Sequence, residues 1–441
     1  MSGKAKNKAE SGEKLHLVDA IGMAVGGMVG GGIFAVLGEA VRYSGNAAFV
    51  GFGIAGVLAL LTGMSYSRLT TKVDKGGGVY VFVSALLGEA VGGTVSWFII
   101  LGYVFTLSLY SYTFGSYGAD LFGLGGNAGG YLGLGIIALL SILNLMGVRA
   151  SGVAEDILVY TKLSIILMTA GAGFFSVTRS QALPVIENSV SGVIGTAALI
   201  FVAYEGFQLL TYDYEVLEDR KRNLGRSMMI SIPLVTGIYM LVAFVTTGAM
   251  TDQAISRHGE TVLAYVAQPE LGHFGVVAIL IAALLSTASA INATIFAQAR
   301  LANRVAKDYE LPAEMFKWRS GGVAVIFVLA SSAIAAAVQF LGSLNQITTF
   351  ASLVFLSVFG VVNLVAFIRH SYSGWQIILP LVGTLGCFGA VAMLVWNTHT
   401  QHPGDLLVIG GIALGLLILR VVYMLTVKKA RDDESEDGDE D

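Results

Sequence analysis

The sequence predicts an all-α polytopic membrane protein with twelve transmembrane helices. Of its 441 residues, 55% are hydrophobic and only 13% are charged, and the mean hydropathy is +0.74. Soluble domains carry about 25% charged residues, so this composition excludes an ordinary soluble protein. Apolar runs of about 20 residues, long enough to cross a ~30 Å hydrocarbon core, recur along the whole chain.

Twelve such runs can be placed in order. They cover residues 17–42, 47–67, 79–117, 129–147, 153–177, 191–216, 227–250, 270–299, 320–339, 344–368, 375–396 and 405–427. Before them lies a polar, basic arm, 1–16, and after them an acidic tail, 428–441, which we expect to be cytoplasmic and disordered because it holds eight acidic residues among its last ten.

Lysine and arginine predict the orientation, because cytoplasmic loops accumulate them. With the N-terminus inside, 22 of the 26 lysines and arginines fall in cytoplasmic segments and three fall outside, while Lys162 lies within the fifth span. Both termini are therefore predicted to be cytoplasmic, which requires an even number of spans.

The first span contains a glycine cluster, GGMVGGG over 26–32, with five glycines in seven positions. Each glycine costs about 1 kcal/mol relative to alanine inside a helix, so the cluster predicts a break. A break within the bilayer frees backbone groups that need polar partners, and thus indicates a binding site. The alternative is a GxxxGxxxG packing stripe of Gly22, Gly26 and Gly30, which leaves Gly27, Gly31 and Gly32 unexplained.

The sixth span predicts a second break, because Glu205 and Gly206 lie in its middle. Transporters built from inverted repeats have paired discontinuous helices, and five spans separate the two breaks. The chain then divides into repeat one (17–178, spans 1–5), repeat two (191–368, spans 6–10) and two appended spans (375–427). The Glu205 side chain could meet a cationic substrate, accept a hydrogen bond from unwound backbone, or cap the broken helix.

Lys162 lies nine residues beyond Val153, at the start of the fifth span, which is about 13 Å into the membrane. Burial disfavours a charged ammonium group, so a lysine at this depth can bind and release a proton. The alternatives are a cation held permanently by carbonyl groups, or one that snorkels to an interface.

Four motifs in order resemble the amino acid, polyamine and organocation (APC) superfamily over about 17–370. They are AVGGMVGGGIF, DKGGGVYVF, FVAYEGFQ with its following charged run, and STASAINATIFAQARLANRVAKDYELP. The closest resemblance is to prokaryotic proton-coupled amino acid transporters, which implies a leucine-transporter-like 5+5 inverted repeat with helices 1 and 6 broken. Where the family usually has a carboxylate after the second break, this chain has Gln208, so a gating role known for that acid does not carry over.

The first break and the resemblance together predict a receptor for an α-amino acid. The N-H groups at the start of the outer half of span 1 would bind the substrate carboxylate. These belong to Gly30, Gly31, Gly32 and Ile33. The resemblance assigns the ammonium group to the carbonyls of Met28, Val202 and Glu205, and it places Ala203 in the same site. Tyr204 and Phe207 could line a side-chain pocket from spans 3, 6, 8 and 10, or could simply pack.

The resemblance also implies a role for Lys162, whose LVYTKL context matches proton-coupled relatives in which a lysine replaces the sodium ion. Its ammonium group would contact the Gly26 carbonyl and the hydroxyls of Ser286 and Ser289.

These observations predict a multi-pass transporter of the plasma membrane that carries amino acids by alternating access and couples their movement to protons. Its partners would be a small-molecule substrate, a proton and the lipid bilayer, with no nucleic acid. No enzyme, cofactor or metal site is expected, because Cys387 is the single cysteine, the six histidines are scattered, and no catalytic motif is present. The alternatives are an amino acid or polyamine exchanger, a sodium symporter, a non-transporting receptor and, least favoured, a channel.

Overall fold

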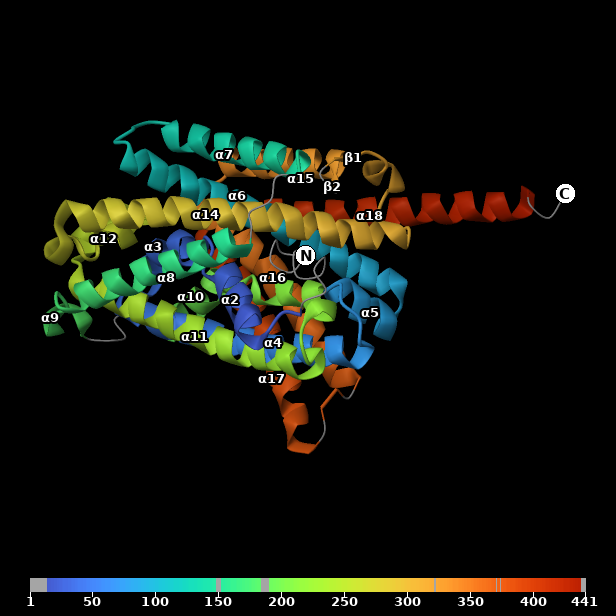
Figure 1. Ribbon diagram of the computed structural model, residues 1–441, viewed down its shortest axis with the longest axis horizontal. Helices are drawn as coiled ribbons and strands as arrows, with labels where there is room; N and C mark the ends of the chain where they lie inside the picture. Colours follow the sequence, from blue (N-terminus) through green and yellow to red (C-terminus); the bar gives the residue numbers. More distant parts are fainter. Residues whose placement is uncertain are drawn as a thin grey trace.

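The computed structural model describes residues 14–147, 152–183, 190–320, 323–369, 371–372 and 374–437, and almost all of them are helical. The arm before Lys14, Arg149 and the last four residues lie outside this range. The long helices run roughly along one common direction, and α18 projects beyond the bundle at one end (Figure 1). This is the all-helical, multi-pass arrangement that the apolar runs predict.

The first half of the chain forms helices that follow the predicted spans, with breaks in three of them. The elements are α2 (Leu17–Met28), α3 (Gly32–Ser44), η1 (Gly45–Ala47), α4 (Ala48–Val73), α5 (Val79–Leu87), α6 (Glu89–Leu121), α7 (Ala128–Leu145), α8 (Gly152–Phe174), α9 (Arg179–Ala182), α10 (Val190–Leu199), η2 (Ile200–Tyr204) and η3 (Phe207–Val216), where η denotes a 3₁₀ helix.

The second half is also helical apart from one short antiparallel strand pair, in which Arg319 pairs with Ala324. The elements are α11 (Arg220–Ala249), α12 (Asp252–His258), η4 (Gly259–Thr261), α13 (Val262–Tyr265), α14 (Gln268–Lys307), η5 (Ala313–Phe316), β1 (Arg319–Ser320), β2 (Val323–Ala324), α15 (Val325–Leu341), α16 (Leu344–Ile368), η6 (Gly374–Ile377), α17 (Ile378–Gln401) and α18 (Pro403–Asp437).

Ten helical segments among the described residues are long and apolar enough to cross a membrane, and α2 and α15 are shorter apolar helices. The first of the ten runs over 32–73 and joins α3 to α4 through η1. Each of the twelve predicted spans therefore contains a helix, but the count of twelve crossings stays a prediction.

The first predicted span is interrupted where the glycine cluster lies. α2 ends at Met28, Val29 leaves the helical conformation (φ −79°, ψ 39°), and α3 begins at Gly32. The sixth span is interrupted at Glu205 (φ −59°, ψ 139°) and Gly206 (φ 128°), between η2 and η3. Ten residues of 3₁₀ helix in η3 are unusual, since runs beyond three or four residues are uncommon.

The prediction of one continuous helix over 79–117 is wrong. Gly88 adopts φ 96° and ψ 158°, which only glycine reaches without strain, and it separates α5 from α6. Hydropathy does not detect this break, because the apolar run continues through both helices.

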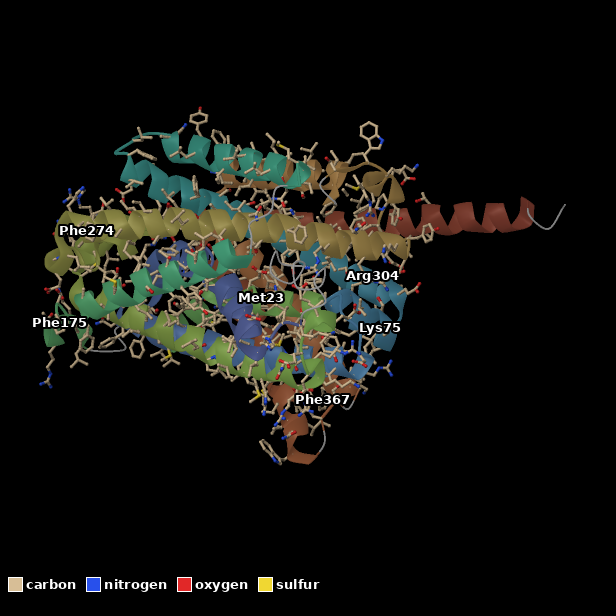
Figure 2. All side chains as sticks on the ribbon, in the orientation of Figure 1. Met23, Lys75, Phe175, Phe274, Arg304 and Phe367 are labelled. Carbon is tan, nitrogen blue, oxygen red and sulfur yellow. The ribbon has the colours of Figure 1, made fainter. Side chains whose placement is uncertain are left out.

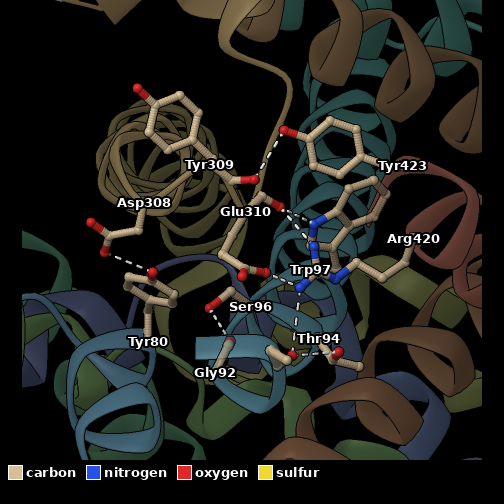
Figure 3. Close-up of polar contacts among 11 residues, drawn as sticks. Tyr80, Gly92, Thr94, Ser96, Trp97, Asp308, Tyr309, Glu310, Arg420 and Tyr423 are labelled. Carbon is tan, nitrogen blue, oxygen red and sulfur yellow. Dashed lines mark hydrogen bonds and ion pairs between the residues drawn. The ribbon is translucent and has the colours of Figure 1, made fainter. Parts of the chain in front are cut away.

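A buried polar cluster contacts the last helix near its middle (Figure 3). Arg420 of α18 forms an ion pair with Glu310, which follows α14, and the Trp97 indole of α6 donates to the Glu310 carbonyl at 2.8 Å. Elsewhere α18 exposes large apolar side chains, with Leu407 80% and Leu425 64% exposed, as expected of a lipid-facing helix.

The last helix, α18, runs into the acidic tail as far as Asp437, and the disorder of the tail stays a prediction. Each residue added to an existing helix gains one hydrogen bond without a new nucleation cost. The helix of the last span can therefore extend into the tail.

The two ends of the bundle differ in the side chains that they present (Figure 2). Lys75 and Arg304 lie at one end, whereas Phe175 and Phe274 lie at the other. Lys75 and Arg304, which the positive-inside rule assigns to one side of the membrane, thus lie at the same end of the molecule. Which side of the membrane that end faces stays a prediction.

Candidate functional site

The two helix breaks are in direct contact. A Cβ atom added at Gly206 would lie 2.5 Å from the Gly27 carbonyl carbon and 2.7 Å from the Met28 nitrogen. A Cβ atom at Gly32 would lie 2.8 Å from Cα of Ala203. Because real Cβ atoms do not approach this closely, the contact between the breaks requires glycine at these positions.

The remaining glycines of the cluster each face a different helix. Gly26 lies against Val159 of α8, and Gly30 lies against Ala290 of α14. Gly31 packs under the ring of Tyr110 in α6. A single packing stripe would face one neighbour, so the cluster serves a break that is surrounded on several sides.

Hydroxyl groups from other helices bind the carbonyls that the breaks leave without helical partners. The Tyr239 hydroxyl of α11 donates to the Met28 carbonyl at 2.8 Å and lies 3.2 Å from the Ala203 carbonyl, so it bridges both breaks. The Ser286 hydroxyl of α14 donates to the carbonyls of Val29, at 3.1 Å, and Gly30. These contacts satisfy backbone groups that would otherwise destabilise an interrupted membrane helix.

Lys162 lies beside the first break and is only 3% exposed. Its Nζ atom donates to the Gly26 carbonyl, in the last turns of α2, at 2.9 Å. This is the backbone contact that the family resemblance implies, and it connects α8 to the helix end where the chain unwinds. Whether this lysine exchanges a proton stays a prediction.

The predicted contact of Lys162 with the Ser286 hydroxyl differs from the structure. Ser286 turns to the Val29 and Gly30 carbonyls instead. The reason is that unwinding frees carbonyl acceptors next to α14, and a neutral hydroxyl satisfies them without a further charge. The contact between Ser289 and Lys162 stays a prediction.

Glu205 and Gln208 organise the second break. The Glu205 N-H donates to the Val202 carbonyl at 3.0 Å, and the Glu205 side chain accepts a hydrogen bond from the Gln208 amide at 2.8 Å. Oε1 of Gln208 accepts from the N-H of Gly206 at 2.9 Å, so this side chain caps the start of η3. The Glu205 carboxylate also lies 3.5 Å from the Tyr110 hydroxyl.

The predicted carboxylate receptor lies at the start of α3. Because α3 begins at Gly32, its first N-H groups, including that of Ile33, have no partner within the helix. Gly30, Gly31, Gly32 and Ile33 are all buried, and the Tyr110 ring covers Gly31. The positive end of the α3 dipole points toward the break.

The aromatic residues on either side of the second break, Tyr204 before it and Phe207 after it, are held by packing. The Tyr204 hydroxyl donates to the Phe52 carbonyl of α4 at 2.7 Å, and its ring packs against Tyr239. Phe207 packs edge to face on Tyr66 and also contacts Phe359. In this arrangement Tyr204 is a support of the break, which corresponds to the packing alternative for that residue.

Tyr239, Ser352 and Tyr110 were not among the predicted site residues. Ser352 of α16 accepts from the Val202 N-H at 3.1 Å and donates to the Leu199 carbonyl at 2.5 Å. A break within the membrane needs hydroxyl donors beside it, and spans 3, 7 and 10 each contain several serine, threonine or tyrosine residues that could supply them. The sequence alone did not show which hydroxyl faces which carbonyl.

Comparison with known proteins places the chain in a described family. It matches the amino acid permease family over residues 15–417. It is 30% identical to an uncharacterised protein of Methanocaldococcus jannaschii, covering 95% of this chain and 97% of that one. It is 29% identical to the inner membrane transport protein YbaT of Escherichia coli (92% and 96%) and 24% identical to the serine/threonine exchanger SteT of Bacillus subtilis (95% and 98%).

Proposed function

This chain belongs to the amino acid permease family, a family of membrane transporters and not of enzymes, and we propose that it carries amino acids across the plasma membrane by proton-coupled alternating access. Family membership implies a leucine-transporter-like fold. We further propose twelve crossings with both termini cytoplasmic, arranged as two inverted repeats, 17–178 and 191–368, with the two breaks in corresponding places.

The observation that carries the coupling proposal is the hydrogen bond from Lys162 to the Gly26 carbonyl at 2.9 Å. A protonated Lys162 holds α8 against the end of α2, next to the substrate site. Loss of the proton removes the charge that strengthens this bond and leaves α2 freer to tilt. A proton can shift the two access states only by its different affinity for each, and this contact supplies such a difference.

The two ends of the substrate are proposed to bind at the two breaks. The N-H groups at the start of α3 receive the carboxylate, as helix N-termini commonly do. Acceptors at the second break, in Val202 and Glu205, receive the ammonium group. Access from either side requires α2 and η3 to separate, because Gly206 now lies against Gly27 and Met28.

Reconstitution of the full-length protein into liposomes tests this function. A pH gradient of one unit stores about 1.4 kcal/mol per proton, which allows about tenfold accumulation of substrate for one proton carried with it. We expect uphill uptake of at least one labelled L-amino acid when the outside is acidic, and no uptake against a gradient when the pH is equal. Uphill uptake that ignores the pH gradient would refute proton coupling.

Lys162→Ala should abolish the gradient-driven component and leave the protein folded. Lys75→Ala removes a lysine from the exposed turn before α5 and is the matched control, because it should leave uptake unchanged. Equal pH-driven uptake by the wild type and Lys162→Ala would exclude this lysine from coupling.

An exchanger is the second candidate, because a relative that spans the full chain is named a serine/threonine exchanger. Both functions fit the same fold and site. Counterflow separates them: an exchanger takes up labelled amino acid only when the liposomes contain unlabelled substrate, whereas a symporter also works into empty liposomes.

A further inference from the structure

Glu205 is a buried carboxylate with no protein cation beside it. It is only 3% exposed, and none of the described lysines or arginines forms an ion pair with it. Its two side-chain hydrogen bonds come from neutral donors, the Gln208 amide at 2.8 Å and the Tyr110 hydroxyl at 3.5 Å. A carboxylate accepts about four hydrogen bonds, so acceptor capacity remains at the break.

Tyrosines lie near the second break. The Tyr110 hydroxyl lies 3.5 Å from the Glu205 carboxylate, and Tyr66 packs on Phe207, two residues after Glu205. Among the described residues, the Tyr66 hydroxyl is fully buried and has no hydrogen-bond partner. An unpaired buried hydroxyl costs free energy, and a bound water or ligand that accepts or donates a hydrogen bond there removes that cost.

The rings of Tyr66 and Tyr103 belong to a larger aromatic cluster around the second break. Tyr66 packs edge to face with Phe207 and Phe359, and Tyr103 packs with Phe355. Aromatic faces attract ammonium groups, and the attraction grows when water is excluded. Glu205 has no ion-pair partner among the described residues, so a bound ammonium group would complete an ion pair there.

We propose that the Glu205 carboxylate is the counter-ion of the ammonium group of the transported solute, with Tyr110 beside it. The proposal rests on the transport function above and names the side chain that recognises the amine of the substrate. The Tyr239 hydroxyl already occupies part of the hydrogen-bond acceptor capacity of the Met28 and Ala203 carbonyls. These carbonyls therefore have less capacity left for an ammonium group than the Glu205 carboxylate has.

The Tyr110 side chain contacts both ends of the proposed substrate site. Its ring lies against Gly31 at the start of α3, and its hydroxyl reaches Glu205. The proposed carboxylate receptor and the proposed ammonium receptor are thus one tyrosine side chain apart. A zwitterionic amino acid bound between them would meet opposite charge at each end.

Paired ligands test this inference with purified full-length protein. The probes are the twenty L-amino acids, each measured by thermal-shift titration beside its 2-hydroxy acid, for example L-serine beside L-glycerate. The hydroxy acid keeps the carboxylate and side chain but lacks the ammonium group. We expect the wild type to bind at least one amino acid tenfold or more tightly than its hydroxy acid.

Glu205→Gln should lower the affinity for that amino acid at least tenfold and leave the affinity for the hydroxy acid within about twofold, so that the preference disappears. Glu39→Gln, which neutralises another buried carboxylate in α3, is the matched control and should keep the preference. An unchanged preference in Glu205→Gln would overturn the inference, because a purely structural role would weaken both ligands equally or neither.

If Glu205→Gln does not fold, Glu205→Asp replaces it. Shortening the side chain by one methylene withdraws the charge from the ammonium group and should reduce the preference several-fold, whereas an unchanged preference again overturns the inference. Failure of the wild type to bind or transport any amino acid would instead refute the transport function, and this inference with it.

Discussion

Tyr239→Phe tests whether one hydroxyl group holds the two helix breaks together. The hydroxyl donates to the Met28 carbonyl at 2.8 Å and lies 3.2 Å from the Ala203 carbonyl, and the residue is fully buried. Phenylalanine keeps the ring and its edge-to-face contacts with Phe52 and Tyr204. The substitution therefore removes the hydrogen bonds with almost no loss of packing.

The magnitude follows from the groups left behind. A buried carbonyl that loses its donor costs about 1–3 kcal/mol. Because the hydroxyl bridges α2 to η2, this cost falls on the arrangement in which the breaks touch. The equilibrium should shift toward separated breaks by about 5- to 150-fold.

Two measurements on the full-length protein follow this shift. Thermal unfolding should occur at a lower temperature, and hydrogen exchange should become faster in the segments around Met28 and Glu205. Tyr66→Phe is the matched control, because it deletes a buried hydroxyl that has no partner among the described residues, and its stability without ligand should be unchanged or slightly higher. If Tyr239→Phe has the unfolding temperature and the hydrogen-exchange rates of the wild type, the bridging role of this hydroxyl is refuted.

Three other predictions follow from single contacts. Gly206→Ala should prevent folding or transport, because alanine at φ 128° would strike the backbone of the first break, whereas Gly237→Ala in open space on α11 should be neutral or slightly stabilising in a thermal unfolding assay. Arg420→Met should destabilise the protein by about 3–5 kcal/mol, because it leaves the carboxylate of its ion pair buried and unpaired; simultaneous neutralisation of that partner should recover most of the loss. The Tyr214 hydroxyl, with two nearby cations, lowers the pKa of Asp74 below its ordinary 3.8. Since the folded pKa is the lower one, the stability that Asp74 contributes is present above pH 4 and lost as the pH falls through the folded value, so unfolding temperatures of wild type and Asp74→Asn should converge in acid.

Local backbone chemistry predicted the two breaks. Five glycines in seven positions cannot continue a helix cheaply, and Glu205 with Gly206 interrupts an apolar run with a charge and a flexible residue. The Gly88 break was missed for the opposite reason: a single glycine within a long apolar run gives no signal in hydropathy, and only its φ of 96° reveals it. Composition also does not report that α18 extends into the acidic tail, because a helix can continue from a preceding apolar segment.

The partners of the breaks could not be predicted in the same way. Ser286 was expected to bind Lys162 and binds the Val29 and Gly30 carbonyls instead. Tyr239 and Ser352 were not anticipated at all, although each binds a break directly. Sequence spacing gives the face of a helix on which a hydroxyl lies, but the carbonyl opposite it depends on how two helices cross.

The sequence by itself determined that this chain spans a membrane many times, that two of its helices are interrupted, and that a lysine lies within a long apolar segment. These are local properties, set by hydrophobicity and by the backbone cost of glycine within one segment. Only the tertiary structure decided which atoms complete the interrupted helices. The Lys162 to Gly26 contact joins residues 136 positions apart, and the Tyr239 to Met28 contact joins residues 211 apart, so both exist only because the helices pack together.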